Sequence, residues 1–152
     1  MLYTGLKYLH IVLAIVAVGF NASYGLILGR AQAANGDGRE MRFALRTVQV
    51  MDDYVANPCY VLLLLTGIGM VHAAGYPWSL LWIWLSLALL AALAVIGFGF
   101  YTPTLRRQIA AFDAGGQESA EFRRLSKAGA LQGAVLGVIV LVIVGLMVFK
   151  PA

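Results

Sequence analysis

Apolar residues in this chain gather into four long runs separated by polar segments. The runs cover residues 2–29, 54–75, 78–101 and 128–149. Each is long enough to cross a hydrocarbon core of about 30 Å, which needs roughly 20 residues of helix. A membrane barrel would instead show alternating segments of about ten residues. The pattern therefore predicts an all-α chain, folded as a four-helix transmembrane bundle in a single domain (residues 1–152).

Composition agrees with a lipid environment. Hydrophobic residues make up 61% of the chain and charged residues 12%, with a mean hydropathy of +0.83. An ordinary soluble domain is about 45–50% apolar and about 25% charged, so that class is excluded. The single cysteine, Cys59, lies inside a run and excludes an internal disulfide and a cysteine-based metal cluster.

The positive charges predict the orientation of the bundle. Four basic residues lie between the first two runs and five between the last two: Arg30, Arg39, Arg42, Arg46, Arg106, Arg107, Arg123, Arg124 and Lys127. Loops rich in Lys and Arg stay in the cytoplasm, so both termini and the uncharged turn near Gly75 are expected on the extracytoplasmic side. This topology also explains the net charge of +4. We therefore expect a lipid bilayer, and no nucleic acid, as partner.

Both cytoplasmic loops are expected to extend the helices. Asn35–Gly38 is a turn signal, after which an amphipathic helix should lead into the second span, with a kink at Asn57–Pro58. Glu118–Lys127 should run without a break into the fourth span. On the other side, Gly75 should end one helix and Pro77 start the next.

Glycines at spacings of four residues mark two helix faces. Gly129, Gly133 and Gly137 form one face in the fourth span, and Gly25 and Gly29 form a shorter one in the first. Small residues at this spacing let helices approach closely in lipid. We expect packing within the bundle, with a homo-oligomer or a partner subunit as alternatives.

Two histidines are the leading candidates for chemistry. His10 and His72 both lie in the outer leaflet of the expected topology, and the face below His10 carries the small residues Ala14, Ala17 and Gly25. Imidazoles that project from facing helices at one depth could ligate a b-type haem, which makes His10 and His72 the candidate metal and cofactor ligands. The structural alternative is a hydrogen bond between helices for His10 and an interfacial position for His72.

Other polar residues are few inside the spans. They are Asn21, Ser23, Asn57, Thr66 and Ser86, and hydrogen bonds across helices would account for them. No acidic or basic residue lies at the middle of a span, which argues against a proton-coupled transporter. Asp52 and Asp53 are expected at a helix N-terminus, where they complement the helix dipole and can meet loop arginines. The functional alternative for them is a proton acceptor or a cation site.

Four motifs carry a resemblance to a known family. They are LKYLHIV at 6–12, GIGMVHAAGYPW at 67–78, FRRLS at 122–126 and MVFKP at 147–151. In this combination they resemble a bacterial family of four-span membrane proteins called domain of unknown function 2269. The resemblance covers nearly the whole chain and implies a four-span fold in the bacterial inner membrane.

A more distant similarity is to small membrane haem proteins, namely a bacterial protoporphyrinogen oxidase and the copper-resistance D type. The shared features are His10 and the ending Phe149–Pro151. The lysine that the oxidase carries in its third span has no counterpart between Trp78 and Tyr101, which argues against the same activity. The similarity implies haem b held by His10 and His72, for electron transfer or redox chemistry. The alternative is a non-catalytic accessory or scaffold subunit of a membrane complex.

The charge asymmetry gives a first testable prediction. A reporter that is active only in the cytoplasm should work when it is inserted at Gly36 or Gly115, and fail at Gly75 or after Ala152. The measurement is reporter activity in intact cells, normalised to the amount of fusion protein. The reverse pattern of activity would contradict the assigned orientation.

Overall fold

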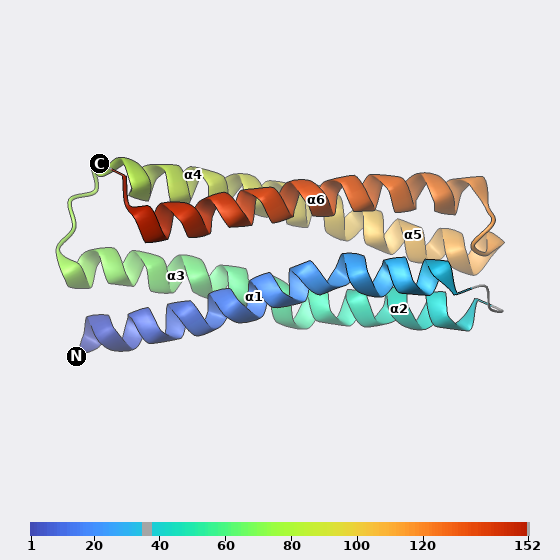
Figure 1. Cartoon of the computed structure of the whole chain (residues 1–152), viewed down its shortest axis with the longest axis horizontal. Coiled ribbons are helices and arrows are strands. Elements are labelled where there is room, and N and C mark those ends of the chain that lie inside the picture. The colour runs from blue at the N-terminus through green and yellow to red at the C-terminus, as the bar shows by residue number, and fades with distance from the viewer. Residues whose placement is uncertain (35–37, 152) are drawn as a thin grey trace.

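The computed structural model describes residues 1–34 and 38–151, which are helical along most of their length (Figure 1). Its helices are α1 (Leu2–Ala33), α2 (Arg39–Met51), α3 (Asn57–Ala74), α4 (Leu81–Ile96), α5 (Thr102–Gly115) and α6 (Ala120–Phe149). Two π-helical segments, η1 (Asp52–Ala56) and η2 (Gly97–Tyr101), join α2 to α3 and α4 to α5. Within this described part, four continuous rods are long and apolar enough to cross a membrane, which confirms the predicted fold class.

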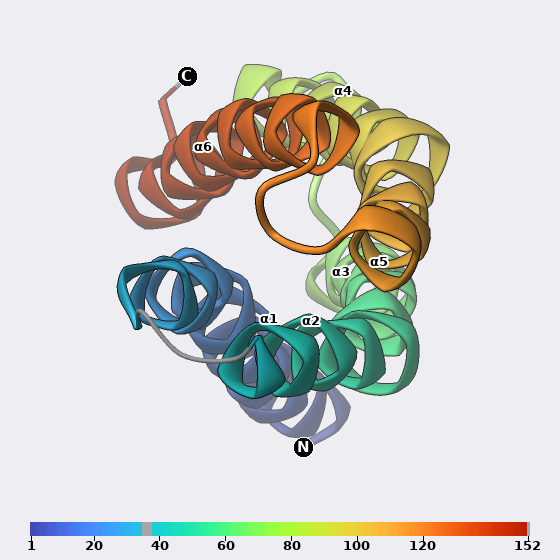
Figure 2. The same ribbon diagram turned by 90° about the vertical axis from the view of Figure 1, so that its right-hand side faces the viewer.

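The four rods run antiparallel, so both chain ends and the turn at Gly75 lie at one end of the bundle (Figure 1). Viewed from the opposite end, the rods follow one another around the bundle in chain order (Figure 2). Helix α1 packs along α3, α6 packs along α4 and α5, and α2 meets α5. The Lys150 ammonium lies 5.4 Å from the ring centroid of Tyr76 and 5.5 Å from that of Trp82, which places the C-terminal end beside the turn.

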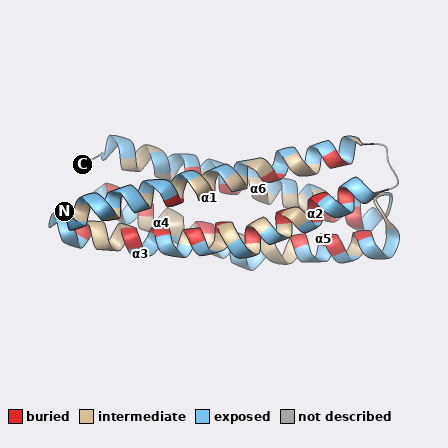
Figure 3. Cartoon of the chain, turned by 90° about the horizontal axis from the view of Figure 1, so that it is seen from below, coloured by how far each residue is buried: buried red, intermediate tan, exposed pale blue. Residues whose placement is uncertain are grey.

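The main core lies in the half of the bundle that the charges assign to the cytoplasm (Figure 3). Phe122, Leu45 and Val48 are the largest fully buried side chains there. Asp113 of α5 pairs at 3.2 Å with Arg42 and at 3.0 Å with Arg46 of α2. These pairs are exposed and contribute little stability, so apolar burial holds this half together.

Both predicted helical extensions are confirmed. Helix α2 begins at Arg39 and continues through η1 into α3 without a break. Helix α6 begins at Ala120, where the side chain of Ser119 accepts a hydrogen bond from the Phe122 N–H at 3.2 Å. Of the turn predicted at Asn35–Gly38, residues 35–37 lie outside the described residues.

The outer turn differs slightly from the expectation. Gly75 ends α3 with a φ of 65°, as its role at a helix end requires. Pro77 does not start the next helix, because the Leu80 N–H bonds the Pro77 carbonyl at 3.3 Å in a turn and Leu80 is still extended. Helix α4 therefore begins at Leu81 rather than at Trp78.

The irregularity expected at Asn57–Pro58 takes the form of a π-helical segment. The Asn57 N–H bonds the Asp52 carbonyl five residues back, and Pro58 follows. The third rod repeats this arrangement, since the Thr102 N–H bonds the Gly97 carbonyl just before Pro103. A proline ring clashes with the carbonyl four residues before it, and a wider turn relieves that clash. The sequence analysis found the first of these two sites and missed the second.

The glycine faces correct the packing prediction in part. A Cβ added at Gly25, Gly29 or Gly137 would have no neighbour within 4 Å, so the expected packing within the bundle is wrong at these three positions. A homo-oligomer or a partner subunit at these glycines stays a prediction. Gly129 and Gly133 do face α5 and η2, where an added Cβ would come within 3.6 Å of the Gln108 side chain and 3.9 Å of the Tyr101 ring, respectively. The four-residue spacing of the glycines identified helix faces made of small residues, but it did not predict which neighbouring element packs against each face.

Gly133 gives the second prediction. Gly133→Leu should destabilise the bundle by about 1–3 kcal/mol, because the added carbons would overlap the Tyr101 ring that a Cβ already approaches at 3.9 Å. The matched control is Val142→Leu, since Val142 is 46% exposed on the same helix and should tolerate one more carbon. Denaturant unfolding of the purified protein in detergent measures both. Equal stability of the two variants would show that the Gly133 face has no packing role.

Candidate functional site

His10 is held in a hydrogen bond between α1 and α3. Its Nδ1 lies 2.8 Å from the Thr66 hydroxyl, which itself lies 2.8 Å from the Leu62 carbonyl. If the Thr66 hydroxyl donates its one proton to the Leu62 carbonyl, His10 donates from Nδ1, and with the other tautomer Thr66 donates to His10 instead. His10 therefore has the interhelical role that was the structural alternative for it.

His72 lies on a different face of α3. Its side chain is exposed and packs edge-on against Trp78, with 5.3 Å between the ring centroids. The α3 residue that faces the His10 ring is Gly67, where an added Cβ would meet His10 Cε1 at 3.4 Å. His72 follows Gly67 by five residues, which on a helix is about 7.5 Å further along and about 140° around. The structure does not bring the two imidazoles together.

The residues present do not fit a haem clamped between His10 and His72. Such a haem needs both ring nitrogens to face one gap, and the two rings face different sides of α3. The two cavities described below are lined by neither histidine. Among the described residues, no group of three or more His, Cys, Asp or Glu side chains is placed to hold a metal ion. Ligation of one haem by both histidines would need another arrangement of α1 and α3 than the one described, and haem binding itself stays a prediction.

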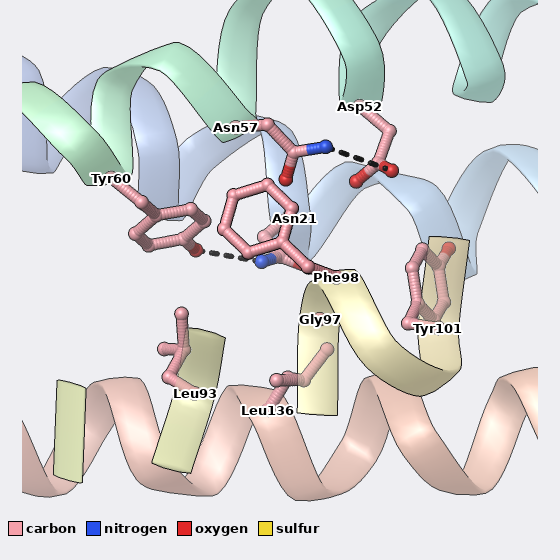
Figure 4. A pocket seen from close by; sticks show the side chains of 9 residues that line it. All are labelled: Asn21, Asp52, Asn57, Tyr60, Leu93, Gly97, Phe98, Tyr101 and Leu136. Atoms are coloured by element: carbon pink, nitrogen blue, oxygen red, sulfur yellow. Dashed lines mark hydrogen bonds between the residues drawn. The ribbon is translucent and has the colours of Figure 1, made fainter. Parts of the chain in front are cut away.

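A buried carboxylate lies where the second and third rods change their winding. Asp52 of η1 is 5% exposed, and its Oδ2 accepts a hydrogen bond from the Thr102 hydroxyl at 2.7 Å. It also accepts one from Asn57 Nδ2 at 3.4 Å (Figure 4). Asp53 points elsewhere and pairs with Arg106 at 3.2 Å. The expected meeting with a loop arginine is thus confirmed for Asp53. The expected helix N-terminus is wrong, because the helix continues through both residues.

A small cavity, which we call the central pocket, lies beside this carboxylate (Figure 4). Its polar and aromatic walls come from Asn21, Asp52, Asn57, Tyr60, Phe98 and Tyr101. Its volume of about 10 Å³ is close to what one water molecule needs. Asn21 Nδ2 donates to the Tyr60 hydroxyl at 2.7 Å across the α1–α3 interface.

Tyr24 approaches the same region from α1. Its ring stacks on Tyr101 with 6.2 Å between centroids and 10° between planes. Its hydroxyl is fully buried and has no hydrogen-bond partner within the described part of the chain. The Asp52 carboxylate is close enough to interact electrostatically with this hydroxyl. A buried hydroxyl without a partner is unfavourable by about 1–3 kcal/mol and points to a group not drawn in the structure.

A second cavity, which we call the inner cavity, lies further toward the end of the bundle formed by α2 and α5. Its volume is about 150 Å³, and Tyr101 lines both this cavity and the central pocket. The characteristic lining residues are small or polar: Gly25, Gly29, Gln32, Gln108, Ser126 and Gly129. Gln108 Nε2 donates to the Ser126 hydroxyl at 2.9 Å, and that hydroxyl donates to the Phe122 carbonyl.

The remaining polar residues of the spans behave in different ways. Asn21 and Thr66 bond across helices, which confirms the prediction for them, whereas Ser23 bonds the Phe20 carbonyl of its own helix. The Ser86 hydroxyl is buried and has no partner among the described residues. Sequence reasoning missed the contributions of Tyr24, Tyr60, Tyr101, Thr102, Gln108 and Ser126. The sequence signal that could have found this region is the second proline, Pro103, which follows the third apolar run as Pro58 follows the start of the second.

Comparison with protein families decides the identity of the chain at the family level. The family model described as a predicted integral membrane protein, DUF2269, matches residues 4–151. The chain belongs to this family. No curated protein and no solved structure matches the DUF2269 chain. The family thus agrees with an integral, multi-pass membrane protein, and the chemistry must be argued from the site itself.

The third prediction separates a hydrogen-bonding His10 from a haem ligand in this DUF2269 protein. If the bond to Thr66 is its role, His10→Ala and Thr66→Val should each destabilise the protein by about 0.5–1.5 kcal/mol, and the double variant should lose no more than the larger single loss. A haem ligand would instead show a Soret absorption band in protein purified from haem-replete cells. His10→Ala would abolish that band and Thr66→Val would retain it, so absorption and unfolding measured on the same samples decide between the roles.

Proposed function

We propose that this protein binds a small molecule inside the membrane, in the inner cavity of its cytoplasmic half. The ligand class that the lining supports is mostly apolar, with one hydrogen-bond donor. The observation that carries the proposal is a cavity of about 150 Å³ that is bordered by Gly25 and Gly29. No neighbouring atom within 4 Å requires a glycine at either position.

The cavity is open on its α1 side, where Gly25 and Gly29 are exposed. Each glycine within a helix is less favourable than alanine by about 1 kcal/mol. A Cβ at Gly25 or Gly29 would meet no atom within 4 Å, so larger side chains would fit there. A ligand that occupies the space would cover both glycines.

The lining indicates the chemistry of the ligand. Much of the wall is apolar and includes Met41 and Leu105, while Gln108, 5% exposed, brings a carboxamide to it. Nε2 of Gln108 is engaged with Ser126, and its Oε1 lies 3.6 Å from the Cβ position of Gly129. This oxygen is placed to accept a hydrogen bond from a ligand hydroxyl or N–H. A cavity of similar volume elsewhere holds benzene, which sets the size class.

In the proposed setting the protein lies in a bacterial inner membrane, and the ligand reaches the cavity from the cytoplasmic side. Haem-dependent electron transfer near the outer leaflet and an accessory role in a larger complex stay predictions. Neither accounts for the inner cavity, which lies in the opposite half of the bundle from His10 and His72.

The fourth prediction tests ligand binding with 4-fluorobenzyl alcohol as the probe. Its ring matches the cavity in size and its hydroxyl can donate to Gln108. We expect a protein-bound ¹⁹F NMR signal with the wild-type protein in lipid nanodiscs. Gly29→Leu should remove this signal while keeping or raising thermal stability, because the new side chain fills the cavity.

The matched control is Gly19→Leu. Gly19 also lies in α1 with nothing within 4 Å of an added Cβ, but it lines neither cavity. This variant should retain the bound signal. A signal that is equal in wild type and Gly29→Leu would come from lipid partitioning and would contradict the proposal, as would the absence of a signal in the wild type.

A further inference from the structure

The central pocket contains a buried charge that the proposed ligand does not use. We infer that Asp52 and the oxygen atoms around it form a site for one small monovalent cation, either a proton carried by water or an alkali ion. This site is distinct from the inner cavity, with which it shares Tyr101. It therefore stands whether or not the inner cavity binds a small molecule.

The first argument is the charge of Asp52. It is 5% exposed, and within the part of the chain that the structure describes it forms no ion pair. The nearby guanidinium of Arg106 pairs with Asp53 instead. Thr102 and Asn57 donate hydrogen bonds to the carboxylate, but they bring no positive charge. Buried carboxylates in membrane proteins are paired, protonated or bound to a cation, and they are functional by default.

The second argument comes from a neighbouring hydroxyl rather than from the carboxylate itself. The Tyr24 side chain is 3% exposed, and its hydroxyl is buried without a partner in the described structure. It stacks on Tyr101, which lines the central pocket, and thus lies next to the pocket without lining it. A water molecule or a hydrated cation beside Asp52 would supply the missing partner for this oxygen.

The size and chemistry of the pocket restrict the occupant. A volume of about 10 Å³ admits a water-sized species and excludes an organic ligand. Figure 4 shows the side chains of Asn21, Asn57 and Tyr60 gathered around the same space as Asp52. These are neutral oxygen donors with one carboxylate among them. One negative charge matches a monovalent cation, whereas divalent and transition metals favour more carboxylate or imidazole ligands.

Asp52 is also the group that can change its charge in this region. The titratable neighbours on the surrounding elements are Tyr24 on α1, Tyr60 on α3, Tyr101 in η2, Arg106 on α5 and Asp53 within η1. Tyrosines are neutral and arginine is charged throughout the ordinary pH range. Asp53 is already paired with Arg106. Protonation would form an O–H bond on the Asp52 carboxylate and leave behind the water that carried the proton; sodium binding would form no covalent bond.

Infrared difference spectroscopy of the full chain in nanodiscs tests the site. In choline buffer, acidification should produce a protonated-carboxyl C=O band that Asp52→Asn removes. Asp53→Asn is the matched control, because it neutralises the adjacent carboxylate at the exposed ion pair and should keep the band. Replacing choline by sodium at constant pH distinguishes the two ions. A band unaffected by sodium assigns a proton site, and a band suppressed by sodium assigns an alkali-cation site that the proton shares.

A second variant covers the case in which Asp52→Asn does not fold. Tyr24→Phe keeps the stacking on Tyr101 and removes only the unpartnered hydroxyl, so it should weaken cation binding several-fold. This would appear as a lower titration midpoint or a higher sodium concentration for half-suppression. A wild-type protein with no Asp52-dependent band under either ion would overturn the proposal. Identical titrations of Tyr24→Phe and wild type would also overturn it.

Discussion

The hydrogen bond between Asp52 and Thr102 joins the two long middle rods where each changes its winding. Asp52 begins the π-helical segment η1, Thr102 directly follows η2, and a proline comes soon after each segment. Without the wider turns the rods would continue as regular helices, and each helix turn that follows would present a different face to the bundle. The position of Asp52 inside the protein, next to an Asp53 that stays at the surface, is a result of this local geometry.

The same region divides the bundle into two halves with different packing. Toward the end that the charges predict to be cytoplasmic, α2 and α5 add a large buried cluster, and the ion pairs of Asp113 lie at its edge. Toward the outer end the buried clusters are smaller, and many apolar side chains on the outside of the rods are exposed, as lipid contact requires. Both cavities adjoin the better-packed half, so they occur where the protein has the contacts to keep them open.

The fold was predictable from hydropathy because lipid allows few alternatives. Every backbone polar group must be bonded within the helix, so a long apolar run specifies a rod whatever its side chains contact. The site was less predictable, because spacing along one helix does not say what lies opposite. Gly25 and Gly29 were expected at a close helix contact and instead border a cavity. Asp52 and Asp53 were treated as a pair, although neighbouring residues on a helix point about 100° apart.

At the α1–α3 interface, the length of the Tyr60 side chain lets it bond Asn21 and reach the central pocket. Side-chain hydrogen bonds across this interface join His10 to Thr66 and Asn21 to Tyr60. These bonds are eleven residues apart on α1 and six on α3, a mismatch of about 7.5 Å along antiparallel axes. A tyrosine can make up most of it, because helix side chains lean toward the N-terminus, which for α3 is the direction of Asn21. The same reach brings the Tyr60 hydroxyl to the central pocket, where a shorter side chain would leave Asn57 and Asp52 without it.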